Sequence, residues 1–563
     1  MIIQSLVRRY EDIGSVSPGW QRREVSYALD ISGNGVLLGV VPLEFHDGKN
    51  MRKREFILPV EPPGRTSGIK SAFLCDNGGY LLGADPKRGA EKFQASRELH
   101  LRALEKTGTV EAAAIKAYFE MGAPADWIKL ISFGTAAAAK FVFQVNGRFI
   151  CYETDSIRAA WDFYYAQSDS DEHEKIRCLV TGKLDSPVPT HGALKLRGGQ
   201  SSGSSLISAN CESFTSYGKT VKDRAADIGK YAAFAYVTAL NDLLKSENNR
   251  QFIGGDTLVY WSEDGGGLEE EVFSWTSQPK ESDADRLSAL MERAASGRKV
   301  QIEGCKPDSK FYLLCLSPNS GRISIRFFYA DHFGAILAHN LRHYSNLELY
   351  KAGNDRFQFL PPWLLLSETT VKKSASDAAP LLGGQLMHSI ISGDPYPLTL
   401  YHSILARIRA GEDITKTKAA IIKAFLIRNF NEGEVVTMML NTQTDDRPYA
   451  LGQLFSVLEQ LQTRAAKGKL NSTIRGRFFT RACSNPGNVF PILLKLSNHH
   501  SSSASLDDKN RIFFEKLKTE ILRKIPKELG FPSTLTLEEQ GKFILGYYHQ
   551  TQDFFTSKKD REE

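Results

Sequence analysis

The sequence changes character near residue 380, and this change limits the possible folds more than any other feature. Before it, segments of alternating β-branched and aromatic residues predict strands between helices, including a hairpin from Phe311–Leu316 and Ile323–Tyr329. After it, apolar residues recur at helical spacing. We therefore expect an α+β protein, with a mixed α/β N-terminal region followed by an all-α helical bundle. The helices expected in the bundle are Leu398–Ala410, Thr415–Asn429, Tyr449–Ala466, Ile474–Ala482, Val489–Ser497, Arg511–Lys524 and Leu537–Phe555.

The length of the chain implies several domains. Its 563 residues exceed a single hydrophobic core, which stops growing at roughly 250–300 residues. We expect an N-terminal α/β region over residues 1–105, a mixed α/β scaffold over residues 106–365, and the helical bundle over residues 366–563. Within the first two regions, helices are expected at Ile2–Tyr10 and Ala226–Leu244, strands at Ile31–Val41, Phe56–Val60, Ala72–Leu74, Tyr80–Leu82, Ile128–Phe133, Lys140–Tyr152 and Arg177–Gly182, and a turn at Asp76–Gly79.

Cysteine usage and hydropathy indicate a cytoplasmic protein. The 7 cysteines are odd in number and form no CxxC motif, so we expect reduced thiols rather than disulfides. No secretory signal is visible at the N-terminus. The longest apolar run, Tyr231–Leu244, includes Asn241 and Asp242 and is too short to span a bilayer, so no membrane partner is expected.

Motifs typical of enzymes are missing from the sequence. There is no Walker-type phosphate loop and no G-x-S-x-G nucleophile elbow. His339 and His343 are four residues apart, but the companion glutamate and third ligand of a zinc hydrolase site are not evident. The spacing of Asp169 and Asp171 resembles a calcium loop without its Gly and distal Glu. We therefore expect a non-enzymatic protein with no metal and no cofactor. A metal-dependent nuclease or hydrolase, and an adaptor that binds proteins alone, remain the alternatives.

Basic residues cluster although the net charge of +6 is small. Nucleic-acid binding depends on such clusters rather than on total charge. The window from Arg464 to Arg481 contains no acidic residue, and a solvated helix face is the alternative explanation. Its cations are predicted to hold a nucleic-acid strand: Arg464, Lys467, Lys469, Arg475, Arg477 and Arg481.

Three distant segments crowd Gly, Ser and Asn around single aromatic or basic residues: Phe73–Gly83, Gly198–Lys219 and Leu316–Arg326. Glycine lets a backbone approach a phosphate closely, while Ser, Asn, Arg and Lys supply its hydrogen bonds and charge. In the third segment, Arg322, Ser324 and Arg326 should share one face of a strand, because side chains alternate with a period of two. Solvent-facing turns would explain each segment equally well when it is taken alone.

Taken together, these segments resemble the large subunit of the type I-C CRISPR interference complex (Cascade), the Csd family. The resemblance rests on Phe73–Gly83, Cys178–Gly182, Ser201–Gly218, Ala232–Leu244 and Leu316–Arg326, in this order. It covers most of residues 1–365 and is looser through the helical region. Residues 208–211 depart from the family pattern, where a more apolar strand is expected.

The resemblance implies a non-catalytic subunit of an RNA-guided surveillance complex. Such a subunit recognises the protospacer-adjacent motif (PAM) on double-stranded DNA, aids duplex opening, supports the displaced single strand and recruits the CRISPR nuclease-helicase. Its other partners would be the CRISPR RNA (crRNA) and the Cascade backbone and handle-binding subunits. Base pairing then reads the long target sequence, whereas protein reads the PAM and nucleic-acid shape.

The resemblance also suggests which residues bind nucleic acid. Those expected at the PAM are Arg65, Ser67, Lys70 and Asn77, with Arg52, Lys53 and Arg54 on nearby phosphates. Those expected near either the 5′ handle of the guide or the mouth of the duplex are Lys195, Arg197, Gln200, Ser201, Asn319, Arg322 and Arg326. Contacts to PAM bases should be few, through polar or basic side chains that reach base edges.

The last part of the bundle, residues 439–563, resembles the Cascade small subunit. In the family this part is also made separately from an internal start. Met438 and Met439 are placed for such a start, because codons for Glu432–Glu434 can form a purine-rich ribosome-binding site just upstream. We therefore expect a small subunit of about 125 residues to accompany the full chain.

Overall fold

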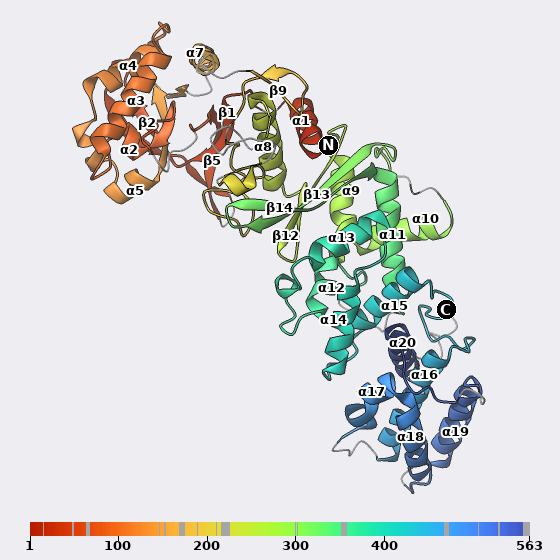
Figure 1. The fold of residues 1–563 in the computed structure, drawn as a ribbon. Coiled ribbons are helices and arrows are strands. Elements are labelled where there is room, and N and C mark those ends of the chain that lie inside the picture. Colours follow the sequence, from red (N-terminus) through yellow and green to blue (C-terminus); the bar gives the residue numbers. More distant parts are fainter. Residues whose placement is uncertain are drawn as a thin grey trace. The chain divides into compact units, whose positions relative to one another are not determined.

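A computed structural model of the chain divides it into two compact units (Figure 1). Unit 1 contains Met1–Lys195 and Ser202–Asp242, and unit 2 contains Leu196–Ser201 and Leu243–Glu563. The domain boundaries expected from the sequence stay predictions. The structure describes residues 1–14, 16–47, 50–62, 68–145, 147–150, 154–167, 175–188, 190–209, 211–215, 226–298, 300, 302–350, 357–466, 472–504, 506–526 and 530–555.

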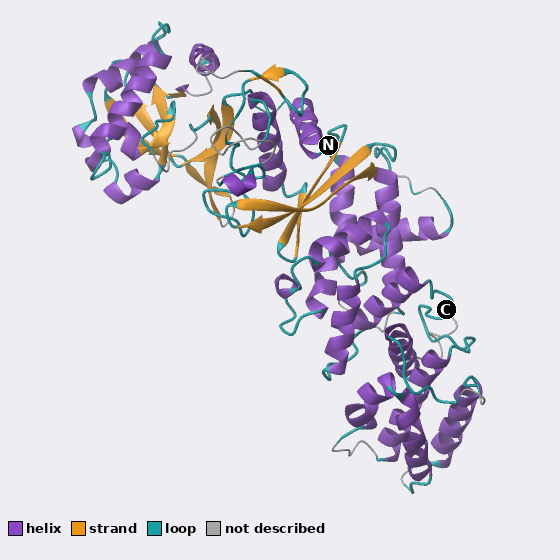
Figure 2. Cartoon of the chain, in the orientation of Figure 1, coloured by secondary structure: helices purple, strands orange, loops and turns teal. Residues whose placement is uncertain are grey.

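Unit 1 is built on two sheets (Figure 2). The first has the antiparallel order β1-β5-β4, and the second has the order β3-β2-β7-β6, in which β2 and β7 are parallel and β8 pairs with β7. The strands are β1 (Trp20–Val25), β2 (Tyr27–Ile31), β3 (Leu37–Pro42), β4 (Glu44–Asp47), β5 (Asn50–Pro59), β6 (Cys75–Asn77), β7 (Lys140–Val145), β8 (Arg148–Phe149), and the separate pair β9 (Ile176–Arg177) and β10 (Leu184–Asp185).

Helices and aromatic rings complete the core of unit 1. Phe73 stacks on Trp161 with 5.1 Å between ring centroids, and the buried His100 ring stacks on Phe119 at 4.4 Å. His100 also accepts a hydrogen bond from the backbone N–H of Leu74 at 2.9 Å, which fixes the segment that enters β6. The helices are α1 (Ile2–Ile13), α2 (Gly78–Leu81), α3 (Gly89–Ala103), α4 (Val110–Met121), η1 (Ala125–Lys129), α5 (Phe133–Ala138), α7 (Asp155–Gln167), η2 (Glu212–Phe214) and α8 (Lys230–Lys245), whose last residues belong to unit 2.

Unit 2 begins with one antiparallel sheet and continues with helices. The sheet order is β11-β12-β13-β14. Its strands are β11 (Arg250–Ile253), β12 (Asp256–Ser262), β13 (Lys310–Asn319) and β14 (Arg322–His332). The helices are α9 (Leu268–Ser277), η3 (Glu281–Asp283), α10 (Ala284–Ala295), α11 (Phe333–Leu347), α12 (Pro362–Glu368), η4 (Ala375–Asp377), α13 (Leu382–Ser392), α14 (Leu398–Arg409), α15 (Lys416–Phe430), α16 (Arg447–Ala465), α17 (Ile474–Ser484), α18 (Pro486–Ser501), α19 (Asp508–Arg523) and α20 (Leu537–Asp553).

Two glycines let α16 and α20 touch backbone to backbone. A Cβ added at Gly452 would overlap the carbonyl oxygen of Phe543 and lie 2.7 Å from the backbone nitrogen of Tyr547. A Cβ added at Gly546 would overlap the carbonyl oxygen of Tyr449. Interiors are packed closely enough that any larger side chain at these positions must push the helices apart.

The structure confirms the α+β class and the expected helices of the C-terminal half, together with the β13–β14 hairpin and α1. These elements carry long periodic patterns, which are the most informative local signal in a sequence. Both α15 and α16 also begin with a side-chain cap, Thr415 and Asp446, which accepts a backbone hydrogen bond of the first turn.

The expected strand at Ala72–Leu74, turn at Asp76–Gly79 and strand at Tyr80–Leu82 are wrong, because the strand β6 begins only at Cys75 and leads directly into α2. Asp76 is fully buried, and its carboxylate accepts the backbone N–H groups of Ala72 and Asn77, each at 2.8 Å. Gly78 is required for close packing rather than for a turn, since a Cβ there would overlap the carbonyl of Ala136. A glycine used for close approach cannot be distinguished from a turn glycine by sequence alone.

Two other expected strands are also wrong. Residues 128–133 run from the end of η1 through a short link, residues 130–132, into α5. Trp127 and Ile131, four residues apart, pack on the core, and Ser132 caps α5 by accepting the backbone N–H of Thr135. In the second case β9 ends at Arg177, and residues 178–182 form the turn to β10. The backbone N–H of Gly182 donates to the carbonyl of Cys178 at 2.8 Å there, and Gly182 has a left-handed φ of +72°.

Candidate nucleic-acid interface

The cations of β5 do not form a single-sided patch. Arg52, Lys53 and Arg54 are all exposed, but successive side chains of a strand point to opposite faces. The Arg54 guanidinium lies over two aromatic rings, 5.1 Å from the centroid of Phe56 and 4.7 Å from that of Phe149. These two ring contacts hold the Arg54 guanidinium in place at the surface of unit 1.

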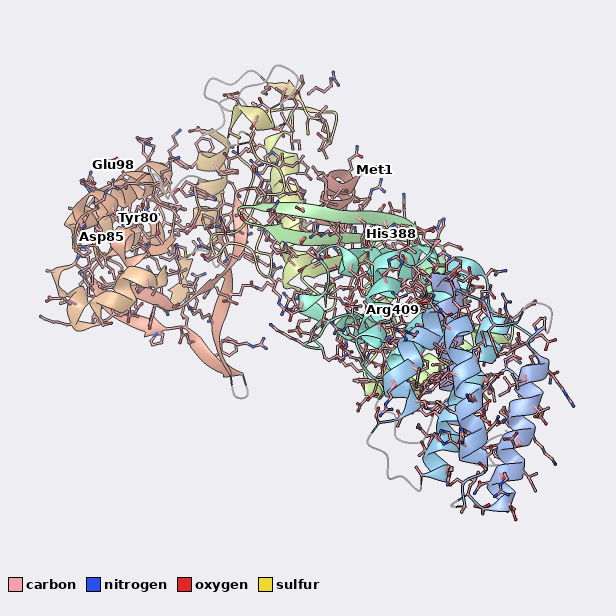
Figure 3. The ribbon with its side chains drawn as sticks, turned by 60° about the horizontal axis from the view of Figure 1, so that its bottom comes forward. Met1, Tyr80, Asp85, Glu98, His388 and Arg409 are labelled. Atoms are coloured by element: carbon pink, nitrogen blue, oxygen red, sulfur yellow. The ribbon has the colours of Figure 1, made fainter. Side chains whose placement is uncertain are left out.

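The residues expected at the PAM lie around the start of α2. Arg65 and Ser67 fall outside the described residues. Lys70 is exposed, and its backbone N–H donates to the hydroxyl of Tyr80 at 3.2 Å (Tyr80 is labelled in Figure 3). Asn77 is half-buried and directly precedes α2, and its Oδ1 has no hydrogen-bond partner among the described residues. The structure thus connects Lys70 to the short helix that Asn77 begins.

Ion pairs anchor the chain just before this region. Glu61 accepts Arg23 at 2.7 Å and Lys140 at 2.6 Å. Burial alone would raise the pKa of the Glu61 carboxyl, but the charges and hydrogen bonds of Lys140 and Arg23 outweigh it and lower this pKa to about 2. Lys140 also lies 3.8 Å from the Asp76 carboxylate, so Arg23 and Lys140 are both already paired with carboxylates within unit 1.

Two segments that are distant in the sequence meet in unit 2. In the loop 196–201, a Cβ added at Gly198 would lie 3.4 Å from the Pro318 side chain, and one added at Gly321 would lie 3.5 Å from the amide oxygen of Gln200. The loop therefore sits beside the β13–β14 turn, which carries Asn319 and Arg322. These contacts bring together the expected residues Arg197, Gln200, Ser201, Asn319 and Arg322.

The structure places a further cation here that was not expected from the sequence. The Arg197 guanidinium lies 4.6 Å from the ring centroid of Phe252, and the Arg250 guanidinium lies 5.4 Å from the same ring. Lys195 belongs to unit 1, where it is exposed and its backbone N–H donates to the side-chain oxygen of Asn241 at 3.2 Å. Arg250 and Phe252 both belong to β11, and only the packing of this strand shows that Arg250 and Arg197 lie over the same ring.

Arg326 is engaged inside unit 2 rather than displayed beside Arg322. Its guanidinium donates to Asp256 at 3.2 Å and to the hydroxyl of Ser317 at 2.8 Å. A β-bulge between Cys315 and Leu316 shifts the register of the hairpin. The bulge leaves one residue of β14 without a partner on β13. It therefore interrupts the alternation that was expected to place Arg322, Ser324 and Arg326 on one face.

The basic window of the bundle separates into engaged and displayed cations. On α17, Arg475 forms an ion pair with Asp413 at 3.1 Å and lies 5.8 Å from the ring centroid of Tyr547. Arg477 and Arg481 are exposed one helical turn apart and form no ion pair among the described residues. Arg464 is exposed in the last turn of α16, whereas Lys467 and Lys469 fall outside the described residues.

The stretch of sequence without acidic residues is longer than the expected window. No Asp or Glu occurs between Glu459 and Asp507, a range that includes all of α17 and α18. The exposed side of α18 adds Asn488, Lys495 and His499, while Phe490 and Leu493 are buried. This wider range of missing acids is the signal in the sequence that would have extended the interface to α18.

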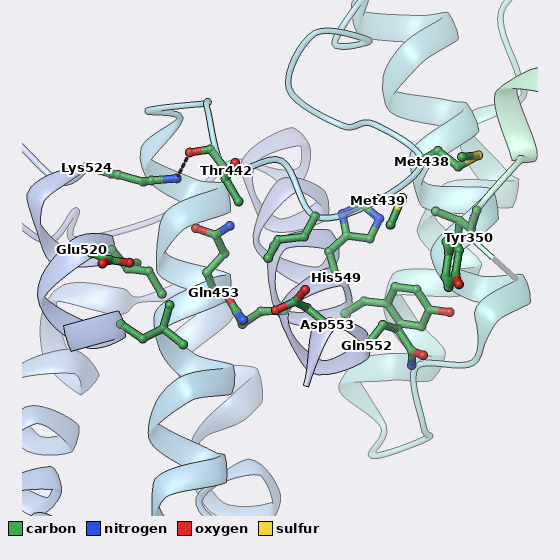
Figure 4. Close-up of a pocket in the computed structure, with 16 residues that line it drawn as sticks. Tyr350, Met438, Met439, Thr442, Gln453, Glu520, Lys524, His549, Gln552 and Asp553 are labelled. Carbon is green, nitrogen blue, oxygen red and sulfur yellow. Dashed lines mark hydrogen bonds between the residues drawn. The ribbon is translucent and has the colours of Figure 1, made fainter. Parts of the chain in front are cut away.

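A cavity of about 630 Å³ lies among α16, α19, α20 and the chain around Met438 and Met439 (Figure 4). At its wall, His549 forms a hydrogen bond through Nδ1 with the Tyr449 hydroxyl at 2.8 Å. Burial and the charge of Lys423 lower the pKa of His549 to about 3, so this imidazole stays neutral and is no general acid at neutral pH. No group of three His, Cys, Asp or Glu side chains within the described ranges could hold a metal ion.

The expected histidine pair is used for packing. The Nδ1 atom of His343 lies 2.6 Å from the Tyr396 hydroxyl, and that of His339 lies 3.0 Å from the carbonyl oxygen of Ile391. His343 is fully buried, and this burial lowers the pKa of its imidazole to about 3. Both rings are thus hydrogen-bonded within unit 2.

The comparisons with known proteins give one clear result. The model of a family described as CRISPR-associated protein (Cas_Csd1) matches residues 5–555. A search of curated proteins gave no match. Among the helices that the structure describes, none is long and apolar enough to cross a membrane.

Proposed function

The chain belongs to the Csd1 family of CRISPR-associated proteins, and on this premise we propose that it is the non-catalytic large subunit of a type I-C Cascade complex. In this role it recognises the PAM on double-stranded DNA, aids duplex opening, supports the displaced strand and recruits the nuclease-helicase. The complex also contains the crRNA and the backbone and handle-binding subunits.

The observation that carries this proposal is the set of exposed cations on α17 and α18, two helices that contain no acidic residue. Arg477, Arg481 and Lys495 are exposed there, without a carboxylate from either helix to neutralise them. A nucleic-acid strand gains affinity chiefly by releasing counterions to such cations. Hydroxyl, amide and imidazole groups between them can hydrogen-bond phosphates without adding negative charge.

PAM reading is assigned to Lys70 and Asn77, with Arg54 on a nearby phosphate. An Asn side chain offers both an acceptor and donors to a base edge; the Oδ1 of Asn77 is buried without a hydrogen-bond partner among the described residues, so its amide group is the part assigned to the base. Backbone contacts near the guide handle or duplex mouth are assigned to Arg197, Arg322 and their neighbours. The meeting of the two loops supports this second assignment.

A small subunit that starts at Met438 or Met439 is part of the same proposal. It would contain α16–α20, including the paired glycines Gly452 and Gly546. It would also keep two of the three carboxylates around Lys542, because Asp446 at 3.1 Å and Glu538 at 3.3 Å lie within it and only Glu432 does not. Both features let this piece keep its own core.

The proposal is tested by DNA binding of the assembled guide complex, with and without a matched PAM. The variant Lys70→Ala/Asn77→Ala should lose most of the preference for the matched PAM, whereas Lys87→Ala, an exposed cation of the same unit, should keep it. An unchanged preference in the double variant would contradict the PAM assignment. Cleavage of DNA by the purified chain with Mg²⁺ would contradict the non-catalytic role.

A further inference from the structure

The solvent side of α19 displays large apolar side chains that the described chain leaves about half exposed. Ile512 is 56% exposed and Phe513 is 49% exposed, although Phe514 and Ile521 on the opposite side are buried. Phe513 is positioned by edge-on contacts with Phe514 at 5.2 Å and Phe554 at 6.5 Å between centroids. An exposed, positioned aromatic ring is typical of a binding surface.

Cations accompany these residues at regular spacing. Lys509, Lys516 and Arg523 follow one another at seven-residue intervals, which places them near one side of the helix at a rise of about 10 Å each. All three are exposed, and none forms an ion pair among the described residues. They are therefore available to a ligand with negative charge.

The acidic groups of α19 and its cap are mostly engaged elsewhere. Asp507 caps the helix through the backbone N–H of Asn510, and Asp508 pairs with Arg511 at 2.9 Å. Glu515 accepts Lys518 at 2.7 Å and the hydroxyl of Ser501 at 2.6 Å. Glu520 lines the cavity described above (Figure 4). Glu520 is exposed and lies within one helical turn of Lys516 and Arg523, but it forms no ion pair among the described residues, so the three cations outnumber this one unengaged carboxylate of their helix.

We propose that this surface, made by Lys509, Ile512, Phe513, Lys516 and Arg523 and called here the α19 stacking face, binds one nucleic-acid strand by base stacking. A base stacks on the Phe513 ring while the cations hold the flanking phosphates. The ligand is a single strand, because the bases of a duplex are stacked on one another and offer no free face. The inference rests on the proposed function and adds a second contact for the displaced strand, distinct from α17 and α18.

The test compares variants of the full chain in the assembled complex. The probe is a DNA target whose two strands are not complementary to each other across the protospacer, so that a single strand is available. Phe513→Ala should weaken binding about 5- to 100-fold, which is the effect of losing one stacked base. Because stacking is not ionic, the slope of log affinity against log salt should stay unchanged. Lys509→Ala/Lys516→Ala should instead lower that slope by about 1.4, at about 0.7 for each phosphate contact.

Two controls separate stacking from other effects. Phe513→Trp should restore binding, because a larger ring offers the same kind of face. Phe163→Ala removes a ring of matched exposure, 51%, which lies under Lys106, and should leave DNA affinity unchanged. Melting temperatures of all variants establish that they fold.

The outcomes distinguish the two proposals. Normal DNA affinity of Phe513→Ala, with weakened binding by Arg477→Ala/Arg481→Ala, overturns the stacking face and leaves the proposed function intact. A complex without salt-dependent DNA binding overturns the proposed function itself. If Phe513→Ala instead lowers association with a second protein copy or another subunit at unchanged DNA affinity, the α19 face is a protein interface and the inference is wrong.

Discussion

Replacing both Arg477 and Arg481 by alanine should weaken single-strand binding in a way that depends steeply on salt. Both side chains are exposed on α17 and lack an ion pair within the described structure. Arg475 differs from them, because it already pairs with Asp413 at 3.1 Å. The structure therefore assigns unequal roles to three arginines that the sequence places in one cluster.

The size of the effect follows from counterion release. Each phosphate contact on a single strand contributes about 0.7 to the slope of log affinity against log salt, so two lost contacts lower the slope by about 1.4. At 0.1 M salt the affinity should fall about 25-fold, which corresponds to about 2 kcal/mol. Arg475→Ala should change the slope of log affinity against log salt by less than half of the contribution of one phosphate contact.

The assay is a titration of labelled single-stranded DNA with the assembled complex at several salt concentrations. Lys372→Ala serves as the matched control, since Lys372 is an exposed cation of unit 2 outside this surface. A double variant with an unchanged slope would refute the interface. An effect of Arg475→Ala equal to that of Arg477→Ala would refute the distinction between engaged and displayed cations.

Further predictions concern stability and the small subunit. Lys542→Met should lower the free energy of unfolding by about 3–5 kcal/mol, since Glu432, Asp446 and Glu538 would lose their shared cation; urea titration measures this loss. Gly452→Ala should cost about 1–3 kcal/mol or more by forcing α16 from α20, visible as a lower denaturation midpoint, whereas the exposed Gly476→Ala should not. Burial lowers the pKa of His100 and His191 to about 4, so the unfolded state binds more protons than the folded state between pH 6.5 and 4. The free energy of unfolding should therefore fall as the pH drops through this window, by up to about 3 kcal/mol per histidine. His100→Gln should reduce the slope of the unfolding free energy against pH. Leucine codons at Met438 and Met439 should abolish the small subunit on an immunoblot, and persistence of the fragment would exclude this start.

Periodic patterns made much of this fold predictable from sequence. The helices of the bundle and the β13–β14 hairpin are long, and their local patterns agree with their environment. The segment around Asp76 was not predictable, because its conformation depends on a buried carboxylate, on His100 and on the carbonyl of Ala136. None of these long-range partners can be read from a turn-like string of Asp, Asn and Gly.

The candidate interface was predictable as regions but not as individual contacts. Clustering of Arg and Lys located α17, and the crowding of Gly and Ser located the loop 196–201. The sequence could not show that Asp256 engages Arg326 or that Asp413 engages Arg475, because these partners are distant along the chain. Nor could it show that Arg250 lies over the same ring as Arg197.

The glycine contact between α16 and α20 also has a consequence during synthesis. Gly452 and Gly546 are separated by about 90 residues, so at roughly 5–20 residues per second α16 waits about 5–20 s for its partner helix. During that time its glycine face and the neighbouring apolar residues Tyr449 and Phe455 lack the helix that later buries them. A nascent chain paused between these helices is therefore the stage at which chaperone binding should be strongest.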